Sequence, residues 1–181
     1  MSTKRIFIAG FGGQGILLIG QMLAYTAMLE GREVSWMPAY GPEMRGGTAN
    51  CTVVISNKPI ASPIVTEVDM LLAMNGSSLD KFTDMVVPGG TIIVNSGIIT
   101  KKVERTDVHA IYVDCNSIAR DELGNEKVAN VVMLGALIGS SDIVDFSRID
   151  EVFRQNFKGG KAKLIDLNLK AVYYWKEHQN E

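Results

Sequence analysis

Short apolar runs alternate with longer segments of helical periodicity along the chain. Apolar residues at 6–9 predict a buried strand, and apolar positions at helical spacing from Ile16 to Ala27 predict a helix directly after it. Further strand-like runs lie at 33–37, 48–55, 68–74, 91–95 and 110–113. Helical patterns lie at about 77–85, 115–122, 128–139, 147–157 and 161–178. This alternation is typical of α/β domains.

The lengths of the connections set the expected topology. The segment between 37 and 48 is too short for a crossover helix, so the strand at 48–55 is expected to run antiparallel to its neighbour. Helical segments separate most of the remaining strands, which favours parallel pairing. We therefore expect a three-layer, Rossmann-like α/β fold: a mixed sheet, mostly parallel with an antiparallel hairpin, and helices on both faces. With 181 residues and 46% hydrophobic content, residues 1–181 are expected to form one domain.

Charge and composition argue against several classes of function. The 18 basic and 20 acidic residues give a net charge of -2, and no basic run marks a nucleic-acid surface. No apolar stretch approaches the roughly 20 residues of a membrane span, and residues 1–5 lead directly into the first strand, so we expect a cytoplasmic protein. Cys51 and Cys115 are far apart in strand-like apolar context. Both are expected to be core thiols, and no metal ligands are expected.

A few isolated polar residues have local interpretations. Ser77 or Ser78 is expected to cap the helix that begins there, and Asn130 is expected to cap the helix at 128–139 rather than contact a ligand. His109 and His178 have no acidic partner at motif spacing. We therefore expect no catalytic residue on this chain.

Three glycines follow the first strand at the spacing Gly10-x-Gly12-x-x-Gly15. A turn without side chains lets an anion approach the unpaired amides at the start of a helix, where the helix dipole also favours negative charge. The alternative is a close-packed turn that binds no ligand. The candidate ligand-binding residues of this turn are Gly10, Gly12, Gly13, Gln14 and Gly15.

The rest of an NAD fingerprint is missing. A ribose-binding acid is expected about 20 positions after the glycines, at the end of the second strand. Glu33 lies at the start of the strand at 33–37, the wrong end to face a nucleotide. A stand-alone dinucleotide-binding enzyme is thus a remote alternative, and the turn is expected to hold a different anion or the backbone of a partner.

A second candidate motif is the polar, glycine-rich loop at 39–47. Arg45 offers a planar fork suited to a carboxylate or phosphate, Glu43 is placed to orient it, and the amides of Gly46 and Gly47 add donors. Since the loop follows the strand beside the glycine turn, it is expected to lie at the same end of the sheet. The alternative is a surface loop with an exposed Arg–Glu pair of little energetic consequence.

Through these two motifs the chain resembles the gamma subunit, or gamma domain, of the 2-oxoacid:ferredoxin oxidoreductases. The resemblance rests on GFGGQG at 10–15, YGPEMRGG at 40–47 and the strand that follows. Residues 128–137 and 168–171 are also similar to that family. The similarity therefore extends over nearly the whole chain.

The resemblance implies one component of a larger enzyme. Such enzymes convert a 2-oxoacid, coenzyme A and oxidised ferredoxin to acyl-CoA, CO2 and reduced ferredoxin. Thiamine diphosphate, Mg²⁺ and iron–sulfur clusters would lie on alpha, beta and delta partners of a heterotetramer, because this chain has neither a GDG opening nor clustered cysteines. Two roles remain open for this chain: lining a coenzyme A site, or assembling the complex without a ligand. The resemblance also covers the smaller subunit of indolepyruvate enzymes, and it leaves the 2-oxoacid open.

Substitution of Arg45 by alanine tests the role of the loop. A loop arginine contributes little to folding, so Arg45→Ala should change the free energy of unfolding by less than about 0.5 kcal/mol. The reconstituted complex should lose turnover or coenzyme A affinity. Urea unfolding and steady-state kinetics measure the two effects. A variant that fails to fold would assign Arg45 to the architecture instead.

Overall fold

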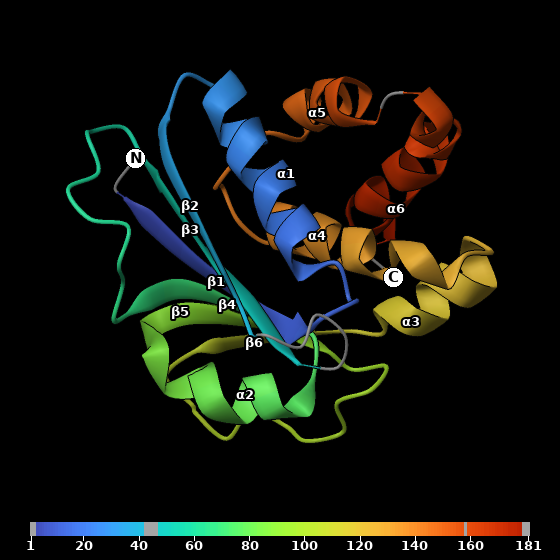
Figure 1. Ribbon diagram of the computed structural model, residues 1–181. Helices are drawn as coiled ribbons and strands as arrows, with labels where there is room; N and C mark the ends of the chain where they lie inside the picture. The colour runs from blue at the N-terminus through green and yellow to red at the C-terminus, as the bar shows by residue number, and fades with distance from the viewer. Residues whose placement is uncertain (1–2, 42–46, 158, 179–181) are drawn as a thin grey trace.

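The computed structural model describes residues 3–41, 47–157 and 159–178. Its centre is a six-stranded sheet in the order β2-β3-β1-β4-β5-β6 (Figure 1). The strands are β1 (Lys4–Phe11), β2 (Glu33–Tyr40), β3 (Thr48–Ser56), β4 (Val68–Ala73), β5 (Val86–Asn95) and β6 (His109–Val113). The β1, β4, β5 and β6 strands are parallel, and β3 runs antiparallel to both β1 and β2. The expected mixed sheet with an antiparallel hairpin is confirmed.

Helices cover both faces of the sheet, so the expected three layers are also confirmed. The helices are α1 (Ile16–Leu29), α2 (Gly76–Phe82), α3 (Cys115–Ser117), α4 (Ala129–Gly139), α5 (Ile149–Asn156) and α6 (Ile165–His178). On one face, α1 and α4 pack on the sheet, and α5 and α6 pack against them; α2 lies on the other face (Figure 1). No helix within the described ranges is long and apolar enough to cross a bilayer.

The chain reverses the direction in which it builds the sheet between β1 and β4. From β1 it passes through α1 to the β2/β3 side, whereas from β4 it passes through α2 to the β5 side. The two helices lie on opposite faces of the sheet, and the switch in direction falls at the carboxyl ends of β1 and β4 (Figure 1). Ligands of open α/β sheets bind at such a switch point. The glycine turn follows β1 and therefore lies there.

Several predicted boundaries differ from the structure for local reasons. The β2 strand continues through Pro38 to Tyr40, because an edge strand tolerates a residue without an N–H. The β5 strand begins at Val86, ahead of the predicted strand at 91–95, with a register shift opposite β4. Neither Ser77 nor Ser78 caps α2: the Asn75 side chain accepts the Ser78 amide at 2.8 Å. The helical segment predicted at 115–122 does form, as the short α3 helix at 115–117 followed by a π-helix at 118–122.

Both cysteines lie in the core, as predicted. Cys51 and Cys115 are fully buried, and burial raises the pKa of each thiol to about 12. The α1 helix packs closely over Cys51, because a Cβ at Gly20 would collide with its sulfur. A similar close approach joins α4 to α6, where a Cβ at Gly135 would collide with the backbone carbonyl of Val172.

Substitution of Gly135 by alanine tests the contact between α4 and α6. Gly135→Ala forces the two backbones apart, and overpacking of this kind should lower the free energy of unfolding by about 1–3 kcal/mol. This loss exceeds the gain of about 1 kcal/mol in helix propensity. Urea unfolding measures the change.

Gly76→Ala at the start of α2 is the matched control. No described atom lies within 4 Å of a Cβ added at Gly76. This variant should match or exceed the wild-type stability, by up to about 1 kcal/mol. Equal losses in both variants would contradict the close packing at Gly135.

Candidate functional site

The glycine turn joins the end of β1 to the start of α1, as its spacing predicts. Gly13 and Gly15 have φ values of 100° and 74°, in the left-handed region that favours glycine. A Cβ at Gly15 would collide with the Asn130 side chain, and one at Gly10 would lie 2.6 Å from Gln14 Oε1. Gly13 differs, since no described atom lies within 4 Å of an added Cβ there. Gly10 and Gly15 thus serve close packing, whereas Gly13 faces open space.

The first turn of α1 presents unpaired backbone amides. The first hydrogen bond of the helix is donated by the Ile19 amide to the Gly15 carbonyl at 3.2 Å. Within the described part of the chain, the amides of Gly15, Ile16 and Leu17 have no hydrogen-bond partner, and no side chain caps the helix. The first turn also carries no acidic residue. The positive end of the helix dipole is therefore not neutralised locally, which favours an anion.

The Gln14 side chain holds the turn against the sheet. Its Oε1 accepts the Phe11 amide at 2.7 Å, and its Nε2 donates to the Met74 carbonyl at 3.3 Å. Both ends of the amide are therefore bound to backbone, one at the end of β1 and the other just after β4. The structure thus places Gln14 as a brace across the switch point.

Asn130 does not have the predicted role. It is the second residue of α4, and its Nδ2 donates to the Gly15 carbonyl at 3.3 Å, so the prediction of a helix cap is wrong. Asn130 is buried and joins α4 to the first turn of α1. No local pattern indicates this contact, because 115 positions separate the two residues.

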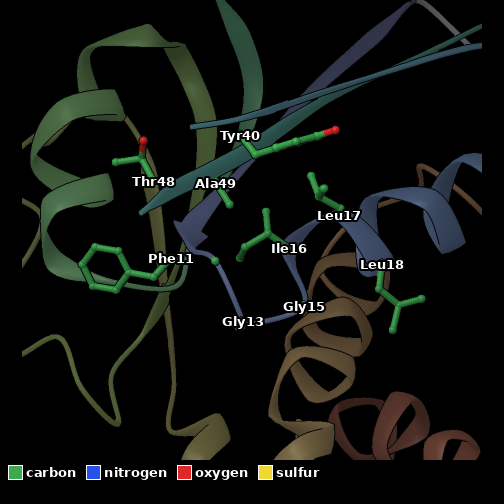
Figure 2. Close-up of a pocket in the computed structure, with 10 residues that line it drawn as sticks. Phe11, Gly13, Gly15, Ile16, Leu17, Leu18, Tyr40, Thr48 and Ala49 are labelled. Atoms are coloured by element: carbon green, nitrogen blue, oxygen red, sulfur yellow. The ribbon is translucent and has the colours of Figure 1, made fainter. Parts of the chain in front are cut away.

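A cavity of about 430 Å³ opens beside the turn. It lies between the first turn of α1 and the ends of β2 and β3 that face the turn (Figure 2). Figure 2 shows Leu17 directed toward Tyr40 across this space, whereas Phe11 points to the other side of the turn. None of the described lining residues carries a charge, and these residues are Phe11, Gly12, Gly13, Gly15, Ile16, Leu17, Leu18, Tyr40, Thr48 and Ala49. The cavity therefore combines apolar side chains with unpaired amides.

The two sequence motifs meet at one hydrogen bond. The Gly12 amide donates to the Gly47 carbonyl at 2.8 Å, which brings the end of the glycine-rich loop to the glycine turn. Glu43, Arg45 and Gly46 lie outside the described residues. The strand pairing that places Tyr40 opposite Ala49 also brings the ends of β2 and β3 to the cavity. Tyr40 and Ala49 were not among the predicted site residues. Their positions on either side of the glycine-rich loop were a usable signal.

The described side chains include no group of three or more His, Cys, Asp or Glu residues that is close enough to hold a metal ion. His178 stacks on Tyr174 in α6, with ring centroids 4.0 Å apart. Cys51 lies beneath α1, where its Sγ is 3.7 Å from the Ile16 carbonyl oxygen, and it remains a neutral thiol because of its raised pKa. The chemistry available at the turn is thus binding by backbone donors and apolar contact.

Comparison with known proteins identifies the family. Residues 5–174 match the family described as pyruvate ferredoxin/flavodoxin oxidoreductase. This chain belongs to that family. The predicted resemblance is thereby confirmed at the level of the family.

Two relatives of the pyruvate ferredoxin/flavodoxin oxidoreductase family differ in length. The ketoisovalerate oxidoreductase subunit VorA of Methanothermobacter thermautotrophicus is 45% identical over 172 residues, which cover 93% of this chain and 35% of VorA. The chain thus spans about a third of that relative. The 2-oxoglutarate synthase subunit KorC of Methanocaldococcus jannaschii is 36% identical over 159 residues, covering 87% of this chain and 85% of KorC.

Two solved structures have the same fold as this chain. The gamma subunit of the keto/oxoacid ferredoxin oxidoreductase of Geobacter sulfurreducens has a TM-score of 0.82 and 28% identity, with 96% of each chain covered. The 2-oxoglutarate:ferredoxin oxidoreductase of Magnetococcus marinus, solved with 2-oxoglutarate, coenzyme A and succinyl-CoA bound, has a TM-score of 0.88 and 24% identity. That alignment covers 98% of this chain and 31% of the other. The mixed α/β architecture is therefore that of the family.

Substitution of Gln14 tests the brace at the turn. Gln14→Leu removes the hydrogen bonds to the Phe11 amide and the Met74 carbonyl, each worth about 0.5–1.5 kcal/mol, so the free energy of unfolding should fall by about 1–3 kcal/mol. The control is Gln155→Leu, because Gln155 is exposed and donates only to Glu151 on the surface of α5. The control should change stability by less than about 0.5 kcal/mol in urea unfolding. If both variants lose the same stability, Gln14 does not secure the turn.

Proposed function

We propose that this chain is the gamma-type subunit of a 2-oxoacid:ferredoxin oxidoreductase and that its glycine turn binds coenzyme A. The observation that carries the proposal is the uncapped start of α1, which opens into a cavity of about 430 Å³ with no charged side chain among its described lining. A diphosphate needs donors and an absence of nearby carboxylates. The apolar remainder of the cavity suits a ligand with a long uncharged arm, as coenzyme A has.

The named relatives support the assembly and the substrate class. VorA and KorC are subunits of ketoisovalerate and 2-oxoglutarate enzymes, and the Geobacter sulfurreducens relative is a gamma subunit. The Magnetococcus marinus enzyme was solved with coenzyme A bound. In this proposal the complex converts a 2-oxoacid, coenzyme A and oxidised ferredoxin to acyl-CoA, CO2 and reduced ferredoxin. The chain alone would carry out no step of that reaction.

The remaining chemistry is assigned to partner subunits because the donors of this chain do not fit it. Iron–sulfur clusters are held by cysteine thiolates, whereas Cys51 and Cys115 are buried thiols with pKa values raised to about 12. We assign the clusters, and thiamine diphosphate with its Mg²⁺, to alpha, beta and delta partners. Electrons would leave the complex to ferredoxin through those partners.

In this proposal the chain binds coenzyme A and orients it. The amides of Gly15, Ile16 and Leu17 would donate to phosphate oxygens, and Leu17 and Tyr40 would enclose the uncharged arm. Gln14 and Asn130 would act through the turn, since each holds its backbone in place. Water would be excluded by the apolar wall. The thiol end of coenzyme A would then leave the cavity toward the partner that carries the reacting acyl group.

The alternative is a subunit that assembles the complex without binding a ligand. The observation that favours it is the exposure of large apolar side chains at the cavity, with Tyr40 63% and Phe11 38% exposed. Such residues are typical of subunit interfaces. The smaller subunit of an indolepyruvate enzyme would present the same features. Binding of coenzyme A separates the first proposal from a purely structural role.

Substitution of Thr48 tests the proposed coenzyme A site. Thr48 is exposed and lines the cavity, so Thr48→Glu adds a negative charge beside the bound phosphates without disturbing the core. Its Kd for coenzyme A should rise about tenfold relative to Thr48→Gln, the uncharged control of similar size. Calorimetry on the isolated chain and on the assembled complex measures both. Equal affinity of the two variants, or no binding by either preparation, would overturn the coenzyme A assignment.

A further inference from the structure

A buried asparagine lies at the end of an otherwise apolar stretch of strand. The β5 strand ends at Asn95, and this residue is as fully buried as the three apolar residues before it, at 92–94. A buried amide costs free energy unless its polar atoms find partners, whereas an apolar residue at this position would need none. The hydrogen bonds that Asn95 makes therefore indicate what this residue does.

Asn95 connects three neighbouring strands at their carboxyl ends. Its Nδ2 donates to the Met74 carbonyl, just after β4, at 3.4 Å and to Asn116 Oδ1, just after β6, at 2.9 Å. Its Oδ1 accepts the Gly97 amide at 3.2 Å in the turn that follows β5. Both N–H groups and the oxygen of the side chain are thus in use. Asn95 therefore joins β4, β5 and β6 at the points where the chain leaves the sheet.

The Met74 carbonyl links this asparagine to the glycine turn. Gln14 Nε2 donates to the same oxygen at 3.3 Å, and Gln14 Oε1 accepts a backbone amide at the end of β1. The Met74 amide in turn donates to the Ala9 carbonyl of β1 at 2.8 Å. A chain of hydrogen bonds therefore runs from the turn through Gln14, the Met74 carbonyl and Asn95 to Asn116. We call these four groups the amide network.

The segments after β5 and β6 pack closely around the network. A Cβ added at Gly97 would lie 2.4 Å from Asp114 Oδ1 and 3.1 Å from the Cβ of Asn116. The Ser96 amide donates to the Val113 carbonyl at 3.0 Å, which ties the two segments together through backbone as well. A buried polar network with satisfied members rigidifies the part of the core that it crosses. The carboxyl ends of β1, β4, β5 and β6 therefore form one hydrogen-bonded unit.

We infer that Asn95 is a positioning residue that holds the glycine turn in its anion-binding conformation. Neither Asn95 nor Asn116 belongs to the described lining of the cavity beside the turn, so both act through Gln14 and not on the ligand. Gln14 places the turn relative to β4 through the Met74 carbonyl, and Asn95 orients that carbonyl from the β5 side. The inference rests on the proposed function only for the identity of the ligand.

The variant Asn95→Asp tests the inference with little change in volume. The carboxylate can still accept the Gly97 amide, but it has no N–H for the two oxygens that Asn95 binds. In nuclear magnetic resonance spectra of the ligand-free chain, the backbone amide signals of Gly15, Ile16 and Leu17 should shift from their wild-type positions. The Kd for coenzyme A, measured by calorimetry, should rise about fivefold. In the assembled complex, KM for coenzyme A should rise while kcat is unchanged, because the network does not touch the reacting atoms.

The control is Thr26→Val near the other end of α1. Thr26 is fully buried, and its Oγ1 donates to the Met22 carbonyl within the helix at 2.8 Å. The substitution removes a buried side-chain hydrogen bond from the same helix at a site outside the amide network. The amide signals of residues 15–17 should keep their wild-type positions, and the Kd should change less than about twofold.

A double variant tests whether the two side chains act through one carbonyl. Since Gln14 and Asn95 both donate to the Met74 oxygen, the loss of affinity in Gln14→Leu/Asn95→Asp should be smaller than the product of the two single losses. Asn116→Ala interrupts the network one residue further from the turn, at a half-buried position. It should move the amide signals of residues 15–17 by a smaller amount than Asn95→Asp, and it provides the test if Asn95→Asp does not fold.

Three outcomes overturn the inference: signals of residues 15–17 that stay in place when the network is interrupted, equal shifts in the control Thr26→Val, or single losses of affinity that multiply as independent effects do. If neither the wild-type chain nor the complex binds coenzyme A, the proposed function fails. The spectra of the ligand-free chain still decide the role of Asn95 in that case, so the two failures are distinguishable.

Discussion

The hydrogen bond from the Asn130 side chain to the Gly15 carbonyl joins the first turns of α1 and α4. It forms only because Gly15 has no Cβ and adopts a left-handed φ, which lets the asparagine approach the backbone. The bond fixes where α1 begins, and with it the direction in which the unpaired amides point. The cavity beside the glycine turn borders this contact, so its shape depends on it. The access of a ligand to the unpaired amides of α1 and the packing of α1 beside α4 therefore depend on the same contact.

The sequence correctly predicted those elements that depend on residues close together in the chain. The spacing of Gly10, Gly12 and Gly15 predicted a strand-to-helix turn, and the short connection before Thr48 predicted the antiparallel hairpin. The register of the sheet and the extension of β2 through Pro38 depend on which strand is at the edge, and local periodicity carries no such information. Asn75 caps α2 in place of the predicted serines because the helix begins one residue earlier than its periodicity indicates.

The candidate site was predictable only in part, for a related reason. The glycine turn and Gly47 came from motifs, and the structure joins them through the Gly12 amide. Asn130 reaches the same region from the opposite half of the chain, because α4 packs beside α1. A single polar residue near the start of an apolar helix resembles an N-cap when the chain is read locally. Its contact with the glycine turn appears only once the helical layer is assembled.

The proline in β2 has a consequence for how the molecule meets other chains. An edge strand offers a row of backbone donors and acceptors that can recruit a further strand and so promote fibrous aggregation. Pro38 removes one backbone donor from this edge strand, because proline has no N–H. Uncontrolled sheet extension is thereby discouraged along β2. Association along this edge then depends on side chains, which recognise partners more selectively than backbone groups do.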